Sequence, residues 1–424
     1  MMKSKNVPKI RFKGLFEEWE LAKINDFVEI FNGLTYSPSN ILNSGGTLVL
    51  RSSNVKNGEI VNADNVYVSS EIVNSDNVLI GDIIVVVRNG SRSLIGKHAI
   101  VKRTMNDTVI GAFMTGLRYK QSTFLNALLN TNQFDSEIAK NLGATINQIT
   151  NGAFKAMQFI IPKSFEEQTA IGNYFQNIDE LINTSQNKLD KLKNVKKACL
   201  GKMFPKKGSA VPEIRFAGFM GEWVEVRLGD FGEFKSNGVD KKSNINEIPV
   251  NLLNYMDVYN RRKINAHNCN TLMPVTARLS QVQDNDVKKN DVFFTPSSET
   301  PDDIGKVMVI EETLPNTVYS YHLVRYRPKE NCFDTIFPNY GFSCDFVRKQ
   351  MILAAQGVQR FVINRGGFEE LRVMLPLLDE QKQIGSFFTQ LDSLTTKTEQ
   401  QINKLKNIKK ACLEKMFVNT TNAL

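Results

Sequence analysis

The side chains best suited to contact a nucleic acid lie in short polar loops of this sequence. Arginine can bind guanine through two hydrogen bonds and asparagine can bind adenine, while serine, lysine and backbone amides bind phosphates. The segment 88–92 concentrates two arginines, an asparagine and a glycine in five residues, directly after an apolar run. A single loop of this kind is also typical of an ordinary solvent-exposed surface. The candidate nucleic-acid-binding residues are Arg51, Ser53, Asn54, Arg88, Asn89, Ser91, Arg92, Lys97, Arg261, Arg262, Lys263, Ser297 and Ser298.

The motifs of common catalytic and cofactor sites are missing from the sequence. The segment 90–98 resembles a phosphate-binding loop, but its spacer has five residues instead of four, and His98 stands where serine or threonine would hold magnesium. The chain has no Asn-Pro-Pro-Tyr/Phe motif of an amino-methyltransferase and no glycine-rich loop suited to S-adenosylmethionine. Its three histidines are dispersed and no cysteines form a CxxC pair, so we expect no metal site. We predict a binding protein without catalytic residues, metal or cofactor of its own.

Two sequence repeats frame the polar loops. The phrase PKIRFKGLFEEWE at 8–20 returns as PEIRFAGFMGEWV at 212–224, and the segment 162–204 returns at 376–417. The blocks between the repeats differ, apart from short phrases where they open and close. A chain of this kind is expected to fold as an internal pseudo-dimer with two unlike domains on one symmetric support. That arrangement suits the recognition of two different half-sites on one extended ligand.

The longer repeat predicts two long amphipathic helices. Apolar residues recur at steps of three and four, close to the coiled-coil spacing. From Glu167 to Met203 there are about 37 residues, or roughly 55 Å of helix at ~1.5 Å per residue, which fits a spacer better than a small core. The alternative is that each helix packs separately on its own domain. The predicted stripes are Ile178, Leu181, Ser185, Leu189, Leu192, Val195, Cys199 and Met203, and Leu391, Leu394, Thr398, Ile402, Leu405, Ile408, Cys412 and Met416.

The formal net charge of +9 comes mainly from the ends of these helices. Eight lysines lie within 188–207 and six within 397–415. The remainder of the chain is close to neutral, so any nucleic-acid contact must use local basic clusters rather than bulk charge. The lysines themselves fit either a solvated helix face or a surface that meets phosphates or an acidic partner without sequence preference.

The blocks between the repeats contain short β-strand patterns separated by turn residues, at 47–118 and again at 250–327. We predict an α+β fold with two mixed α/β domains, each built on a twisted sheet. The predicted segments are a first domain with its tag at 1–161, a helix at 162–204, a linker, second tag and second domain at 205–375, and a helix and tail at 376–424. The longest apolar run, Ile83–Val87, is far too short for a membrane span, and the polar start MMKSKNVPK lacks the pattern of a signal peptide. We therefore expect a cytoplasmic protein.

Over nearly its whole length the chain resembles the specificity subunit of type I restriction–modification enzymes. The resemblance rests on the doubled Ile-Arg-Phe-x-Gly tag, the doubled helix start with Glu167-Gln168 and Glu380-Gln381, and the doubled ending Lys-Met-Phe. The phrases at 50–55 and 81–92 add to it. Because recognition domains vary between relatives, the resemblance does not say which residues touch bases.

The resemblance implies two target recognition domains, each of which reads one half of a bipartite, asymmetric sequence in double-stranded DNA. It implies that the helices pair as an antiparallel coiled coil and set the gap between the half-sites. It also implies two modification subunits that bind S-adenosylmethionine and methylate adenine, and restriction subunits that use ATP and magnesium. Two other readings stay open: a scaffold that recruits proteins without reading DNA, and a self-contained restriction–methylation enzyme, which the missing motifs disfavour.

The missing motifs lead to a direct prediction. We expect the purified chain alone to show no methyl transfer and no DNA cleavage, because it lacks the residues that hold a cofactor and a target base. The measurement is incorporation of labelled methyl groups into DNA, with the reconstituted complex as the positive control. Methyl transfer by the isolated chain would contradict the prediction.

Overall fold

The computed structural model describes residues 6–142 and 147–418. The chain divides into two compact units. Unit 1 contains the residues up to Asn187 together with those from Gln400 onward, and unit 2 contains Lys188–Glu399. Each unit therefore combines one variable block with the start of one long helix and the end of the other.

Unit 1 contains two four-stranded sheets. Their orders are β2-β11-β8-β9, which is antiparallel throughout, and β10-β4-β7-β3, in which β10 and β4 run parallel. All four residues of β8 are buried, because this strand lies between others and faces the core on both sides. The strands are β1 Glu20–Lys23, β2 Glu29–Asn32, β3 Ile41–Leu42, β4 Thr47–Leu50, β5 Val55–Lys56, β6 Glu59–Ile60, β7 Val66–Val68, β8 Ile83–Val86, β9 His98–Ile100, β10 Thr108–Ile110, β11 Met114–Arg118 and β12 Gln158–Ile161. The short helices are α1 Ile24–Phe27, α2 Ser122–Leu128, α3 Asn132–Asn141 and α4 Asn151–Lys155.

Unit 2 repeats this architecture with a different sequence. Its sheets have the orders β14-β21-β17-β19 and β16-β15-β20, and β15 runs parallel to β20 as β4 does to β10. The strand β13 pairs with β23 as β1 pairs with β12, at the point where each block opens and closes. The strands are β13 Val224–Arg227, β14 Gly232–Lys235, β15 Ile248–Leu253, β16 Met273–Ala277, β17 Val292–Phe294, β18 Ser297–Ser298, β19 Val307–Val309, β20 Thr317–Tyr319, β21 Val324–Pro328, β22 Phe361–Val362 and β23 Arg372–Leu375. The short helices are α6 Leu228–Phe231, α7 Tyr255–Tyr259, α8 Leu279–Asp284, α9 Pro338–Gly341, α10 Asp345–Ala354 and α11 Arg365–Glu369.

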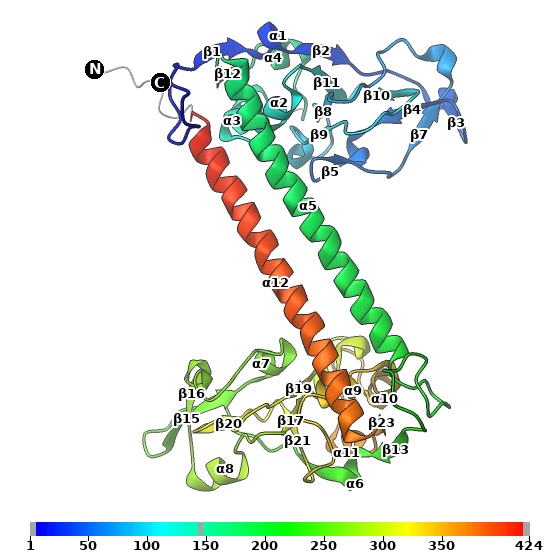
Figure 1. Ribbon diagram of the computed structural model, residues 1–424, viewed down its shortest axis with the longest axis vertical. Coiled ribbons are helices and arrows are strands. Elements are labelled where there is room, and N and C mark those ends of the chain that lie inside the picture. The colour runs from blue at the N-terminus through cyan, green and yellow to red at the C-terminus, as the bar shows by residue number, and fades with distance from the viewer. Residues whose placement is uncertain (1–5, 143–146, 419–424) are drawn as a thin grey trace. The chain divides into compact units, whose positions relative to one another are not determined.

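The two predicted long helices are α5, Phe165–Lys202, and α12, Leu378–Met416 (Figure 1). Within unit 1, Lys409 lies 2.6 Å from Asp179, and the hydroxyl of Tyr174 lies 3.3 Å from the sulfur of Cys412. A later residue of α12 thus meets an earlier residue of α5, so the two segments are antiparallel. In unit 2 the pairing is also antiparallel, with Lys193 bonded to Glu399 and Lys196 bonded to Asp392. The antiparallel pairing expected from the resemblance is confirmed within each unit.

The buried stripe of the helices differs from the predicted one at two equivalent places in each copy. Leu181 and Val195 are 52% and 45% exposed, whereas Ile182 and Lys196 are half-buried in their place. In the second copy the exposed residues are Leu394 and Ile408, and the half-buried ones are Thr395 and Lys409. The stripe alternates strictly between steps of four and three, which keeps one seam against a partner helix. The prediction was wrong here because it followed the nearest apolar residue, whereas the seam tolerates a lysine whose ammonium group is ion-paired.

A buried ion pair attaches each tag to the start of its helix. Arg11 donates two hydrogen bonds of 2.6 Å to Glu167, and Arg215 donates two of 2.7 Å to Glu380. The glutamate side chains are only 2% and 1% exposed. The planar guanidinium matches both carboxylate oxygens, which is the geometry that offsets the desolvation of both charges. This contact explains why the tag and the helix start are both repeated in the sequence.

The same tags also contact the end of the other helix within their unit. The backbone amide of Ile10 donates to the carbonyl of Lys415 at 2.9 Å, and Ile214 donates to Lys202 at 3.0 Å. The ring of Trp19 meets Phe417 edge-on, as the ring of Trp223 meets that of Phe204. Each tag therefore joins the two helix segments of its unit to one hydrophobic core. No helix formed by the described residues is both long and apolar enough to cross a membrane.

Arg11→Ala is expected to lower the free energy of unfolding by ~3–5 kcal/mol, because it leaves the buried carboxylate of Glu167 without its cation. Arg215→Ala should have a similar cost. The control is Arg365→Ala, which breaks an exposed pair with Glu369 along one helix and should cost ~0.3–0.5 kcal/mol. Denaturant titrations compare the three variants. Equal costs for Arg11→Ala and Arg365→Ala would show that the tag ion pair does not stabilise the unit.

Candidate nucleic-acid interface

Two of the predicted loops come together in unit 1, although they are far apart in the sequence. The side-chain amide of Asn89 donates to the hydroxyl of Ser52 at 2.9 Å. Both residues line a pocket of 560 Å³, whose walls also include Tyr36 and Phe113. The loops follow β4 and β8, and the backbone of Phe113 precedes β11. The ends of three strands thus form one concave, mainly apolar site with a few convergent polar groups, as binding sites usually have.

Arg88 lies at the edge of this loop pair with its side-chain hydrogen-bond donors free among the described residues. Its guanidinium carbon lies 4.7 Å from the centre of the Phe113 ring, which is 52% exposed. Within the described ranges, no hydrogen bond or ion pair occupies its guanidinium group. Stacking on the ring restrains the side chain but leaves its donors available for a base or a phosphate. Arg92 and Lys97 are also exposed on the same stretch, and Ser91 bonds to Ser93 at 3.0 Å.

The loop at 51–54 serves the fold as well as the pocket. Asn54 is fully buried, and its side chain accepts from the amide of Arg51 and donates to the carbonyl of Ala63 at 2.7 Å. Its amide therefore holds the turn and does not reach the surface. Arg51 lines the pocket and donates to the carbonyl of Asp64 at 2.6 Å, and the hydroxyl of Ser53 is buried without a partner among the described residues.

In unit 2 the predicted run at 261–263 is mostly occupied by contacts within the protein. Arg261 is half-buried, and its guanidinium donates to the carbonyls of Val307 and Asn339 and to the hydroxyl of Ser343. Burial lowers the pKa of Arg261 from its ordinary value, although the nearby Tyr340 and Asp392 oppose this effect. Arg261 is thus a packing residue in this structure, which corrects the expectation of a surface cation.

Its two neighbours in that run lie at the surface. Arg262 bonds to Asp257 and to the hydroxyl of Thr271 at 2.7 Å, while Lys263 is exposed. The contacts of Arg262 hold it against the turn that follows α7. Lys263 is therefore the cation of this run that is best placed to meet a phosphate.

The two predicted serines of unit 2, Ser297 and Ser298, form the short strand β18, which pairs with β22. Ser298 is buried and donates to the carbonyl of Thr300 at 2.5 Å, so its hydroxyl is occupied. The hydroxyl of Ser297 accepts a hydrogen bond of 3.1 Å from Arg360, an exposed arginine that sequence reasoning missed. Its position in the sequence could have indicated this role, because Arg360 lies a few residues before the closing phrase that begins at Gly366. A few residues before the equivalent Gly152 of unit 1, the side chain of Asn147 donates to the carbonyl of Gly90.

Ion pairs with a buried aspartate connect these strands at the ends opposite to the loops. Arg118 binds both carboxylate oxygens of Asp82 at 2.9 Å, and Arg327 binds both of Asp291 at 2.6 and 2.7 Å. Burial raises the pKa of Asp291, and the hydrogen bonds from Arg327 oppose that shift. The hydrogen bonds from Arg327 therefore favour the charged form of Asp291. These equivalent pairs place β8 against β11 and β17 against β21 with the same register.

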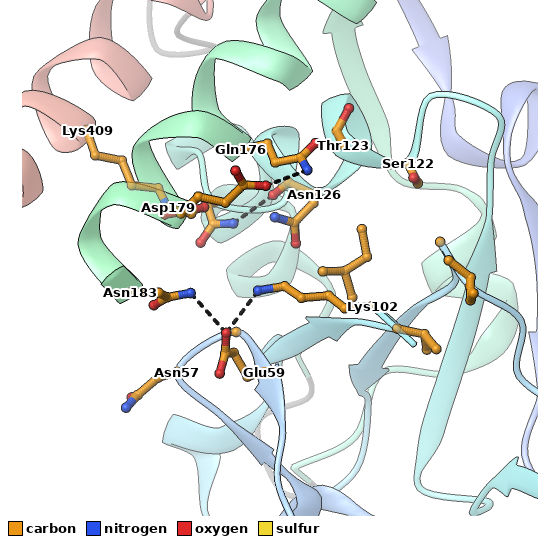
Figure 2. A pocket seen from close by; sticks show the side chains of 17 residues that line it. Asn57, Glu59, Lys102, Ser122, Thr123, Asn126, Gln176, Asp179, Asn183 and Lys409 are labelled. Carbon is orange, nitrogen blue, oxygen red and sulfur yellow. Dashed lines mark hydrogen bonds and ion pairs between the residues drawn. The ribbon is translucent and has the colours of Figure 1, made fainter. Parts of the chain in front are cut away.

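A second pocket of unit 1, of 510 Å³, lies between the block and the first part of α5 (Figure 2). Figure 2 shows Glu59 between Lys102 and Asn183, which donate to it at 2.9 and 3.0 Å. Asp179 on the facing wall is paired with Lys409. Because the drawn carboxylates already have partners, this pocket offers no free charge, and we assign its contacts to the attachment of the block to the helix. The described residues contain no cluster of His, Cys, Asp and Glu that could hold a metal ion.

Comparisons with known proteins agree with this architecture. A family model described as the type I restriction modification DNA specificity domain matches residues 16–194 and 220–407. The chain is 22% identical over 423 residues to the type I restriction enzyme StySPI specificity subunit of Salmonella potsdam, covering 95% of this chain and 89% of that protein. It is 21% identical over 430 residues to the EcoKI specificity subunit of Escherichia coli strain K12, with the same two coverages.

Solved structures share the fold at low sequence identity. The type I restriction–modification S subunit from M. genitalium matches with a TM-score of 0.61 and 14% identity, over 98% of this chain and 100% of that one. A chain from a study of complex assembly and conformational transition of the type I R-M system matches with a TM-score of 0.50 and 13% identity, over 96% and 98%. At these identities the likeness establishes the fold alone.

Arg88, which is exposed, and Arg261, which is bonded within the protein, are expected to respond differently to substitution. Arg88→Ala should weaken DNA binding by ~1–3 kcal/mol if the side chain contacts a base, and should leave the melting temperature unchanged. Arg261→Ala should lower the melting temperature, because it removes three hydrogen bonds to partly buried acceptors. Fluorescence anisotropy on a target duplex and thermal unfolding measure the two effects. If Arg88→Ala binds DNA with the wild-type affinity, the 88–92 loop is an ordinary surface loop.

Proposed function

Because the chain belongs to the family of type I restriction–modification DNA specificity domains, we propose that it recognises a bipartite, asymmetric DNA site, with one half-site for each unit. A specificity subunit is the DNA-recognition component of its complex and is not itself the enzyme. The single observation that carries the proposal is the internal duplication: two units share one framework but differ in the loops that end its strands.

The two units share equivalent backbone hydrogen bonds at the ends of their parallel strands. In unit 1 the amide of Gly111 donates to the carbonyl of Leu50, and in unit 2 the amide of Ser320 donates to that of Leu253, both at 2.9 Å. We define the strand-end corner as the place where these strands end. In unit 1 its residues are Ser52, Arg88 and Phe113, and in unit 2 the equivalent residues are Tyr255, Ser297 and His322. A protein that reads a symmetric site needs equal corners, so unlike corners support an asymmetric one.

We further propose that the chain works with two modification subunits and with restriction subunits, in the cytoplasm. On this proposal S-adenosylmethionine, ATP and magnesium belong to those partners, which methylate adenine and cleave DNA. The doubled tags support a partner that is present twice, because both expose apolar side chains at equivalent positions. Phe16 and Met220 are 83% and 88% exposed, and Ile10 and Ile214 are 46% and 47% exposed.

The lysine-rich helix ends support a contribution that is independent of sequence. Lys193, Lys196 and Lys409 already have carboxylate partners within their units. Exposed lysines such as Lys191 and Lys197 are available for phosphates or for an acidic partner surface. Such contacts contribute affinity that falls steeply with salt and does not select a sequence.

Methylome sequencing of a host that carries this chain and its modification partner tests the proposal. The expected result is methylated adenine in a motif with two unlike halves and an unspecified gap. A palindromic or continuous motif would contradict it. The alternative, a scaffold that binds no DNA, predicts no salt-dependent shift of labelled DNA by the complex.

The helix pair generates a second prediction, since we propose that it sets the gap between the half-sites. Seven residues inserted after Gln186 and seven after the equivalent Glu399 keep the alternation of four and three in both helices. They add ~10.5 Å of rise, close to three base-pair steps of ~3.4 Å. Methylome sequencing should show unchanged half-sites with a longer gap. New half-sites with the original gap would show that the helices do not act as a spacer.

A further inference from the structure

The two strand-end corners are equivalent in backbone and differ in which loop supplies a guanidinium group. The ion pairs Asp82–Arg118 and Asp291–Arg327 fix the register of the strands, so that Phe113 corresponds to His322 and Arg88 to Ser297. The backbone of Arg88 bridges to Gln148, and that of Ser297 pairs with Val362. Unit 2 thus has serine where unit 1 has its free arginine.

Arg360, which belongs to a different segment of the chain, places a guanidinium group beside Ser297. It lies one residue before β22, is exposed, and donates one hydrogen bond from Nη2 to the Ser297 hydroxyl at 3.1 Å. No carboxylate within residues 6–142 and 147–418 forms an ion pair with it. One short tether therefore orients the side chain, and its other donors stay available.

An aromatic pair, Tyr321 and His322, occupies the place in unit 2 that Phe113 has in unit 1. The rings of Tyr321 and His322 have centres 4.0 Å apart, and Tyr321 is 47% exposed. The pKa of His322 is lowered first by burial and then by the positive charges of Lys241 and Arg360. The positive charge of Arg360 thus disfavours protonation of His322, and Asp240 opposes this effect.

The other arginines predicted for unit 2 do not compete for this role. Arg261 is half-buried and donates to backbone carbonyls, and Arg262 is held by Asp257 and Thr271. Arg360, by contrast, is exposed and, among the described residues, keeps one edge of its guanidinium group free.

We infer that Arg360 reads a guanine in the half-site of unit 2, from the place where Arg88 stands in unit 1. The inference rests on the proposed function and names the residue and the base class for its second half-site. A guanidinium group matches the O6 and N7 acceptors of guanine with two parallel hydrogen bonds, and the Ser297 tether leaves it the donors to do so. A phosphate contact would need only positive charge, so lysine in place of Arg360 separates the two roles.

The test uses the complex reconstituted with its modification partner and selection of bound sites from a randomised duplex library. Arg360→Ala and Arg360→Lys should both lose the preference for guanine at one position of one half-site, by roughly 5- to 150-fold, with the other half-site unchanged. Arg88→Ala should relax the other half-site. The control, Arg365→Ala, removes an exposed arginine of unit 2 that is paired with Glu369, and should select the wild-type motif.

The outcomes separate this inference from the proposed function. If the wild-type complex selects no bipartite motif, the proposed function fails. If the wild-type motif is bipartite and both Arg360 variants still select it, the inference alone fails. If Arg360→Lys keeps the motif while Arg360→Ala only weakens binding to all sequences, Arg360 contacts a phosphate and the base-reading role is overturned. Unchanged melting temperatures show that the variants are folded.

Discussion

The buried bond between a tag arginine and a helix glutamate is the constraint on which each unit depends. Arg11 with Glu167, and Arg215 with Glu380, are desolvated charges that are satisfied only in one relative orientation of tag and helix. The tag then presents its tryptophan to the phenylalanine that ends the other helix. A block that begins on such a tag and closes on β12 or β23 has both of its ends fixed. Its interior is free to vary, because none of these contacts involves the loops.

This separation between a fixed frame and variable loops allows one chain to contain two units of the same architecture with different side chains at their strand ends. The Asp–Arg pairs and the shared backbone hydrogen bonds maintain the strand ends in both units. The side chains at the strand-end corner can then differ between the units, both in residue type and in the segment of the chain that supplies them. Unit 1 has its exposed arginine two residues after β8, and unit 2 has one in the residue before β22. The two arginines therefore come from different segments of their blocks.

The sequence predicted what depends on local pattern and repetition. The long helices and the two α/β blocks follow from periodicity and from the repeats, whereas the meeting of the loops at 51–54 and 88–92 does not, because β4 and β8 belong to different sheets. Burial of a polar group does not follow, because it depends on what packs over it. Asn54 and Arg261 looked like surface donors and are held inside. Lys196 and Lys409 looked solvated and lie in the helix seam. Arg360 escaped notice because no motif surrounds it.

The order in which the chain is made has a consequence for how it matures. Unit 2 is continuous, Lys188–Glu399, so a ribosome releases all of its parts in succession. Unit 1 is interrupted by that whole length, and the rings of Trp19, Phe124 and Phe175 pack against Phe417, which is synthesised after all of unit 2. The core of unit 1 therefore stays partly uncovered until unit 2 has been synthesised. A product terminated between Glu399 and Phe417 would keep a finished second unit and an unfinished first one.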